Sequence, residues 1–471
     1  MPAFALADDD IELRWTNNVR LSTSYQFNQV PPLGADLCPY GSNCGYGAGF
    51  TQGRADWISE LDAERGDFGL STSLEARKDV VEPQSSYFQL YEAKLHGMVD
   101  LAGRPLTFAL GRQSVVWGES QFFAGNAISG AQAPIDATYG FDSMGYQSTT
   151  HFLPVGQASA TWQVSQSVTL AAYQQFEWRR DRIDPEDAYA GPGDTLGAKD
   201  TRQIFLASDY YGPVRYGRAA VPAPSGTDQF GVELKLRRDD WDLGLYALQF
   251  DAKTPAVIYY KYYDSYTLDY ARAIGLLGAS LSGRLGDATL GAEFSARRHM
   301  PLVDGGIFLH GDQQGRPGPR GDTLHGLASL TVPVEPSGLL PGGATWVTEL
   351  AANHLSAITA NAWQFAPGRD RDAAGLRSVV TAQFYQVLPR LDVSVPIGLG
   401  WNFAGRSSVL PEMNRGTGDI SAGLSATFDR GWTASVTVTH YFGQDQILVP
   451  GYSGRPLSDW DKVAASLQTS F

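Results

Sequence analysis

The side chains best suited to chemistry gather in residues 108–130, which read F-A-L-G-R-Q-S-V-V-W-G-E-S-Q-F-F-A-G-N-A-I-S-G. Within this stretch, Arg112 and Glu119 flank Trp117. A guanidinium and a carboxylate at these positions can form an ion pair that fixes the segment and leaves the indole beside a pathway. A buried ion pair can also serve only to fix the register of the chain, without contacting any solute. Both interpretations remain open from the sequence.

The sequence contains no recognisable enzyme or metal motif. It has no G-x-S-x-G, no H-E-x-x-H and no P-loop. Of its seven His, only His151 lies in the segment from Trp117 to His151 that follows the predicted strand. We therefore expect no catalytic residue, no metal site and no cofactor.

The stretch begins on a predicted strand, because apolar and small residues alternate over residues 106–111. The same period recurs at 68–77, 230–236 and 420–428. An apolar face opposite a polar face is typical of the wall of a transmembrane barrel. No apolar run approaches the ~18–20 residues that a spanning helix needs. Any membrane span must then be built from strands.

The order of these strands predicts the fold class. Long connections, among them 181–227 and 259–270, alternate with short turns, and the chain ends on an alternating strand closed by Phe471. We expect an all-β, transmembrane antiparallel barrel of about 18 strands (16–18), formed by residues 11–471 as one domain. Residues 116–153 would join the fifth and sixth strands and fold inward as a lumenal constriction or plug. This architecture predicts the outer membrane of a Gram-negative bacterium.

The ends and the overall charge add smaller constraints. Residues 1–10 (M-P-A-F-A-L-A-D-D-D) are interpreted as a leader remnant, with an ordinary acidic N-terminus as the alternative. Cys38 and Cys44 are the only cysteines, and in an exported chain they are expected to form a disulfide. The net charge of −14 argues against a nucleic-acid partner.

Four short motifs resemble one family. They are G-R-Q-S-V-V-W-G-E-S (111–120), A-P-I-D (133–136), F-L-P-V-G (152–156) and Y-Q-Q-F-E-W (173–178). Together they resemble the domain-of-unknown-function 1302 family of proteobacterial outer-membrane proteins, although Ala133 stands where that family usually has Asn. The resemblance implies a barrel that handles hydrophobic compounds with a periplasmic partner and an inner-membrane transporter of lipid-like substrates.

The candidate site consists of residues expected to line the lumen or the constriction. In a regular strand Arg112 would lie on the same face as the apolar Leu110. We therefore expect a β-bulge that turns the Arg112 side chain into the lumen. The other inward-facing charges are of mixed sign, as in Glu75 and Arg77, and this favours bracing of the wall over ion selectivity. The predicted lumen residues are Arg112, Gln113, Trp117, Glu119, Phe122, Phe123, Asn126, Asp136, Tyr173, Glu177 and Arg179.

Three functions fit this sequence. The first is a transport protein or channel for hydrophobic or amphipathic small molecules or lipids. The second is a structural or docking barrel of an envelope complex, and the third is a general porin for small polar solutes. The expected partners are outer-membrane lipid, a small hydrophobic solute, a periplasmic protein and an inner-membrane transporter.

Overall fold

The architecture is that of a computed structural model, which describes most of the 471 residues. The residues described are 4–8, 11–28, 48–139, 151–183, 203–206, 214–218, 224–260, 265–303, 307–309, 317–429, 431–443 and 461–471. Cys38 and Cys44 lie outside these residues, so their predicted disulfide remains a prediction.

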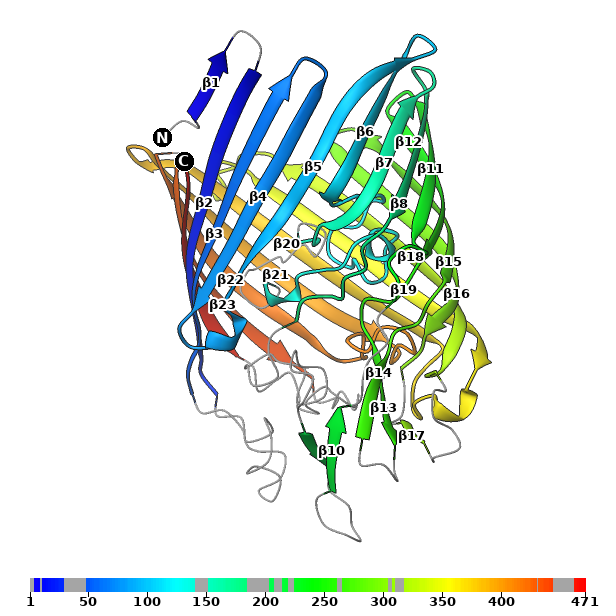
Figure 1. Ribbon diagram of the computed structural model, residues 1–471. Helices are drawn as coiled ribbons and strands as arrows, with labels where there is room; N and C mark the ends of the chain where they lie inside the picture. The colour runs from blue at the N-terminus through cyan, green and yellow to red at the C-terminus, as the bar shows by residue number, and fades with distance from the viewer. Residues whose placement is uncertain are drawn as a thin grey trace.

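The main sheet is a closed antiparallel barrel (Figure 1). It has nineteen strands, of which β1 (Phe4–Asp8) pairs with the start of β2 and the other eighteen form the wall. The wall closes where β24 pairs with β2, with Val19 opposite Thr469. The predicted all-β barrel of about 18 strands is therefore confirmed.

The wall strands follow one another in sequence around the barrel. They are β2 (Ile11–Gln26), β3 (Gly49–Arg65), β4 (Phe68–Asp79), β5 (Tyr87–Leu101), β6 (Arg104–Gln113), β7 (Val155–Gln163), β8 (Val168–Gln175), β11 (Phe230–Arg238), β12 (Trp241–Phe250), β15 (Ile274–Leu285), β16 (Ala288–Pro301), β18 (Arg320–Val334), β19 (Ala344–Ala360), β20 (Asp372–Leu388), β21 (Leu391–Ala404), β22 (Gly418–Phe428), β23 (Trp432–Phe442) and β24 (Lys462–Ser470).

Alternation along each strand separates an apolar outer face from a polar inner face. On β22, Leu424 is 52% exposed whereas Ser421 is 2% exposed. Exposed Leu, Val, Phe and Trp recur around the barrel, including Leu110 on β6 and Val436 on β23. Leaving so many large apolar side chains exposed on one continuous surface is unfavourable in water. It is the outer surface that a lipid environment requires.

Short turns gather at one end of the barrel and long connections at the other (Figure 1). The turn between β3 and β4 uses Gly66 with φ +57°, and the turn between β20 and β21 uses Arg390 with φ +70°. Both described ends of the wall lie at the short-turn end, where Asn17 and Phe471 exchange backbone hydrogen bonds of 2.8 and 2.9 Å. The alternation of long and short connections along the sequence predicted this arrangement.

A second, five-stranded sheet lies at the long-connection end (Figure 1). Its order is β17-β13-β14-β10-β9, with β9 (Gln203–Leu206), β10 (Val214–Arg218), β13 (Ala256–Tyr260), β14 (Ser265–Asp269) and β17 (Ile307–Leu309). The sequence indicated only loops at 181–227 and 259–270, and that expectation was wrong. Runs of three to five residues are too short for alternation to identify them.

The helices within the described residues are single 3₁₀ turns, namely η2 (Pro83–Ser85), η3 (Ser129–Ala131), η4 (Ala137–Tyr139) and η7 (Ala362–Gln364). In the described part of the chain, no helix is long and apolar enough to cross a membrane.

Candidate functional site

The connection between β6 and β7 lies against the inner face of the opposite wall (Figure 1). These are the fifth and sixth wall strands, and the described parts of the connection are 114–139 and 151–154. Its backbone makes few regular ladder bonds, so its buried N–H and C=O groups need other partners. Side chains of β16, β18 and β19 supply many of them for residues 119–128.

Two carboxylates on the wall accept the N–H groups of this connection. Glu349 of β19 accepts from the Ser120 hydroxyl at 3.0 Å and from the backbone N–H groups of Gln121, Phe122 (3.3 Å) and Phe123 (2.9 Å). Glu349 is fully buried. A carboxylate that accepts several backbone N–H groups makes strong charge-assisted bonds. It therefore holds residues 120–123 at one place on the wall.

Glu293 of β16 makes a second contact of the same kind. It accepts from the N–H groups of Glu119, Ser120 (3.1 Å) and Ile128 (2.8 Å). Arg297, also on β16, donates to the carbonyl oxygens of Gly125 (3.2 Å), Asn126 (2.7 Å) and Ala127 (2.9 Å). We call Glu293, Arg297 and Glu349 the wall clamp. Together they satisfy both donors and acceptors of residues 119–128.

Asn126 completes the attachment with its side chain. Its amide donates to the carbonyl oxygens of Gly326 (2.9 Å) and Ala352 (3.2 Å), and its Oδ1 lies 3.0 Å from Nδ1 of His325. Asn126 is only 2% exposed. Its position is that of an anchor to β18 and β19 rather than of a side chain that meets solute.

Gly118 explains why the W-G-E step of the motif contains glycine. Its φ is +104°, and a Cβ at this position would lie 2.3 Å from Oε1 of Glu293. The side chain of any other residue would both strain the backbone and displace the clamp carboxylate.

The face of the connection toward β8, β12 and β15 is packed with apolar side chains. The Trp117 ring lies 5.1 Å from that of Tyr173 and 6.2 Å from that of Tyr246. Ile128 is fully buried in the same cluster, beside Ile274 and Leu276. This sector of the lumen is therefore filled.

Arg112 has a different partner from the one predicted. Its Nη2 lies 2.6 Å from Oε1 of Glu177, and its Nη1 donates to the Leu90 carbonyl oxygen at 2.9 Å. Glu119 instead accepts from the Ser280 hydroxyl at 3.3 Å. The predicted Arg112–Glu119 pair was wrong, because strand pairing brings Glu177, just beyond β8, beside β6.

The predicted bulge at Arg112 was also wrong. Pairing of β6 continues without a shift, with Arg112 opposite Ala93 on one side and Gly156 on the other. A register shift does occur on the neighbouring pair of β4 and β5, where Ser73 faces Glu92 and Leu74 faces Leu90. Tyr91 is the extra residue, and it lines the lumen cavity described below.

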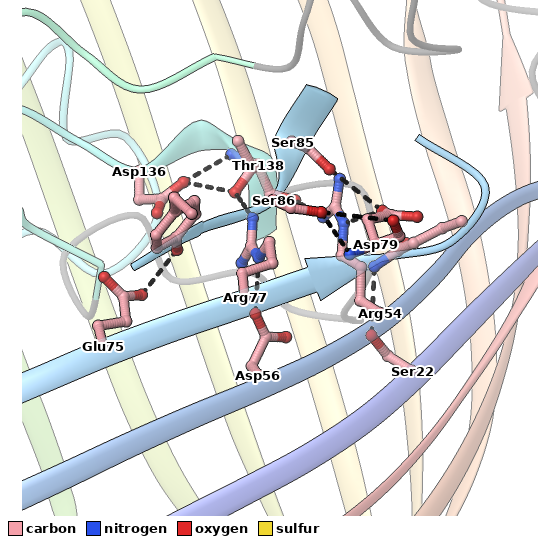
Figure 2. A network of polar contacts seen from close by, with 12 residues as sticks. Ser22, Arg54, Asp56, Glu75, Arg77, Asp79, Ser85, Ser86, Asp136 and Thr138 are labelled. Carbon is pink, nitrogen blue, oxygen red and sulfur yellow. Dashed lines mark hydrogen bonds and ion pairs between the residues drawn. The ribbon is translucent and has the colours of Figure 1, made fainter. Parts of the chain in front are cut away.

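The inner face of β3 and β4 carries a buried charge network (Figure 2). Arg77 donates to Oδ1 of Asp56 and to the Thr138 hydroxyl, both at 2.6 Å. Arg54 donates to Asp79 (2.8 Å) and to the Thr138 carbonyl oxygen (2.9 Å). These bonds attach η4 of the connection to the wall opposite the clamp.

Arg182, which follows β8, extends this network. Its Nη1 lies 2.6 Å from Asp136 and 3.5 Å from Glu75, and it donates to the Tyr87 hydroxyl at 2.7 Å. Burial alone would lower the pKa of Arg182, but Asp136, Tyr87 and Glu75 outweigh burial and raise it. Arg182 therefore stays charged and holds the two carboxylates together.

A cavity of about 360 Å³ remains beside this network, between the connection and the wall. Strands β2, β3, β4, β5 and β24 form one side, and the connection forms the other through Asp136, Tyr139 and His151. Its lining combines charged groups with aromatic rings and the aliphatic side chain of Ile58.

Of the eleven predicted lumen residues, Asp136 lines this cavity. Trp117, Phe122, Phe123 and Asn126 pack against the wall or bond to it, and Tyr173 lies on the wall strand β8. Gln113 bonds to Gln157 across β6 and β7, and Arg179 donates to the Pro154 carbonyl oxygen at 2.8 Å. Four further residues of the lumen were not among those predicted from the sequence: Arg20, Asp56, Tyr91 and Glu349. The sequence signal that could have identified them is a charged or aromatic residue at an inward-facing position of a long strand.

Metal chemistry receives no support from the described residues, which include no group of three or more His, Cys, Asp or Glu side chains placed to hold an ion.

The structure and sequence together define a closed 18-stranded barrel with an apolar outer face and a connection bound inside it. The chain belongs to the family described as "Protein of unknown function (DUF1302)", whose profile matches residues 81–471. The resemblance predicted from the four motifs is thus confirmed.

Solved structures with a similar fold share little sequence with this chain. Acinetobacter baumannii OccAB1 has a TM-score of 0.47 and 11% identity, over 100% of this chain and 98% of that chain. Pseudomonas aeruginosa OccK2 (OpdF) has 0.47 and 11%, over 98% and 97%. Salmonella typhi OmpF in complex with daunomycin has 0.43 and 8%, over 99% and 100%. A comparison with curated proteins returned no match.

The first prediction concerns Gly118. Gly118→Ala should lower the free energy of unfolding by about 1–3 kcal/mol, because the positive φ and the Glu293 contact both oppose a Cβ. Gly125→Ala is the matched control, since its Cβ would meet only the flexible Leu410 side chain at 3.3 Å and Glu412 at 3.9 Å. Denaturant unfolding of both variants in detergent tests this. Equal stability of the two would contradict the role of Gly118.

The second prediction concerns Lys253, which lies just beyond β12. Burial lowers the pKa of Lys253 from 10.5 to about 8, although Asp181 and Asp251 oppose the shift. Between pH 8 and 10.5 the unfolded chain therefore binds a proton that the folded chain does not, so stability should rise with pH across this window. Lys253→Met should remove this rise, worth up to about 3 kcal/mol. Unfolding of both proteins at pH 8 and pH 10 measures it, and parallel pH dependences would refute the prediction.

Proposed function

We propose that this protein is an outer-membrane channel for hydrophobic or amphipathic small molecules. Solute would pass through the cavity beside β2, β3, β4, β5 and β24. Residues 116–153 would form the constriction that bounds this passage. The continuous apolar outer face supports a place in the membrane, and the alternation of long and short connections supports an outer-membrane orientation.

One observation carries the proposal: the connection packs tightly on one side and leaves a cavity on the other. The side toward β8, β12 and β15 is filled by the apolar cluster around Ile128. The other side retains about 360 Å³. A passage through the barrel is therefore expected on the charged side, where its lining suits an amphipathic solute better than a purely apolar one.

Two other functions give different outcomes. A general porin for small polar solutes draws support from the charged lining, which includes Asp56 and Glu75. A structural or docking barrel draws support from the tight attachment of residues 119–128. A periplasmic partner and an inner-membrane transporter remain part of the proposal. We propose no catalytic activity.

Planar-bilayer conductance of point variants tests the position of the passage. Ile58 lines the cavity, so Ile58→Trp should reduce single-channel conductance to about half or less by filling space. Ala55→Trp, three residues away on the exposed face of β3, is the control and should conduct as the wild type does.

Deletion of residues 118–132 tests the constriction and should raise conductance several-fold. Unchanged conductance after the deletion would refute the constriction. A large conductance that neither variant alters would favour a general porin. Absence of current from every variant, in folded protein, would favour the docking barrel.

A further inference from the structure

We propose that the lumen cavity binds the carboxylate group of an amphipathic solute and that Arg20 is the residue that recognises it. This inference deepens the proposed function by naming a substrate class. It rests on the partners of the arginines around the cavity and on the aromatic surface beside Arg20.

Arg20 differs from the other arginines of this region. Arg54, Arg77 and Arg182 each have a carboxylate partner, namely Asp79, Asp56 and Asp136. Within the described part of the chain, Arg20 has no carboxylate partner, and its Nε has no hydrogen-bond partner. Arg20 also lines the cavity. A guanidinium left without an anion at the wall of a cavity is a suitable receptor for one.

An aromatic surface lies next to this guanidinium. The Tyr139 and His151 rings stack with centroids 4.7 Å apart, and both residues line the cavity. The Cζ atom of Arg20 lies 5.8 Å from the Tyr139 centroid. Tyr91 presents a further ring to the same space. The Arg20 guanidinium beside these rings is complementary to a solute that carries an acidic group on an aromatic or aliphatic body.

The acidic residues of the cavity are already neutralised by neighbours. Asp56 pairs with Arg77, and Asp136 and Glu75 share Arg182. Binding of a carboxylate to Arg20 would therefore break none of the existing ion pairs. Oδ2 of Asp56 is buried without a partner, so an ammonium group is the competing ligand and has to be part of the test.

Three probes that share a phenyl ring on a four-carbon chain distinguish a carboxylate site from an ammonium site. They are 4-phenylbutyrate, 4-phenylbutanamide and 4-phenylbutylamine. Titration calorimetry on the folded full-length chain in detergent should show the tightest binding for the carboxylate. Arg20→Gln should weaken carboxylate binding about tenfold while leaving amide binding unchanged, because one charge-assisted contact is lost. Arg20→Lys should restore part of the affinity, since it keeps the charge without the planar fork.

Arg14→Gln is the matched control. Arg14 lies on the same strand in the same inward phase but is paired with Asp62 at 2.8 Å. It should not change carboxylate binding. Equal affinity for all three probes, tightest binding of the amine, equal losses in Arg20→Gln and Arg14→Gln, or no binding of 4-phenylbutyrate at millimolar concentration would each overturn the proposal.

The channel and the binding site can fail independently. Arg20-dependent carboxylate binding without any bilayer current would refute the channel and leave the site intact. Current that Ile58→Trp reduces, with no dependence of binding on Arg20, would refute the site and leave the channel intact.

Discussion

The structure depends on one constraint: a chain that leaves the sheet and enters the barrel must still satisfy its backbone polar groups. Glu293, Glu349 and Arg297 meet this need for residues 119–128, two as acceptors and one as donor. Buried charges are costly without partners, but here each one faces several backbone groups of opposite polarity. The charges and the irregular backbone therefore stabilise each other.

This attachment divides the lumen into two unlike sectors. Toward β8, β12 and β15, Trp117 and Ile128 pack into a closed apolar cluster. Toward β2, β3 and β4, η4 is bound through Arg54 and Arg77 (Figure 2). A cavity remains beside these residues. The position and chemistry of the proposed passage would follow from where the connection is fixed, since the same wall without the connection would enclose one wide polar lumen.

The sequence predicted the barrel well because alternation is a local signal that each strand carries by itself. It also predicted a long connection between the fifth and sixth strands, which is where β6 and β7 are joined, but the role of this connection as a constriction stays a prediction. It failed for Arg112, whose partner Glu177 is 65 residues away and is brought close only by strand register. The same limit applies to Glu349, a single acid within β19 that acts on a segment over 200 residues earlier. The bulge at Tyr91 likewise depends on the pairing of β4 with β5, which no local pattern specifies.

Hydrogen–deuterium exchange of residues 119–128 tests the wall clamp most directly. The account predicts slow exchange of the Phe123 and Ile128 amides in the folded barrel, because Glu349 and Glu293 accept them. It also predicts faster exchange in the double variant Glu293→Gln, Glu349→Gln while the wall strands stay protected. Rapid exchange of these amides in the wild type, or protection that the double variant leaves unchanged, would contradict it.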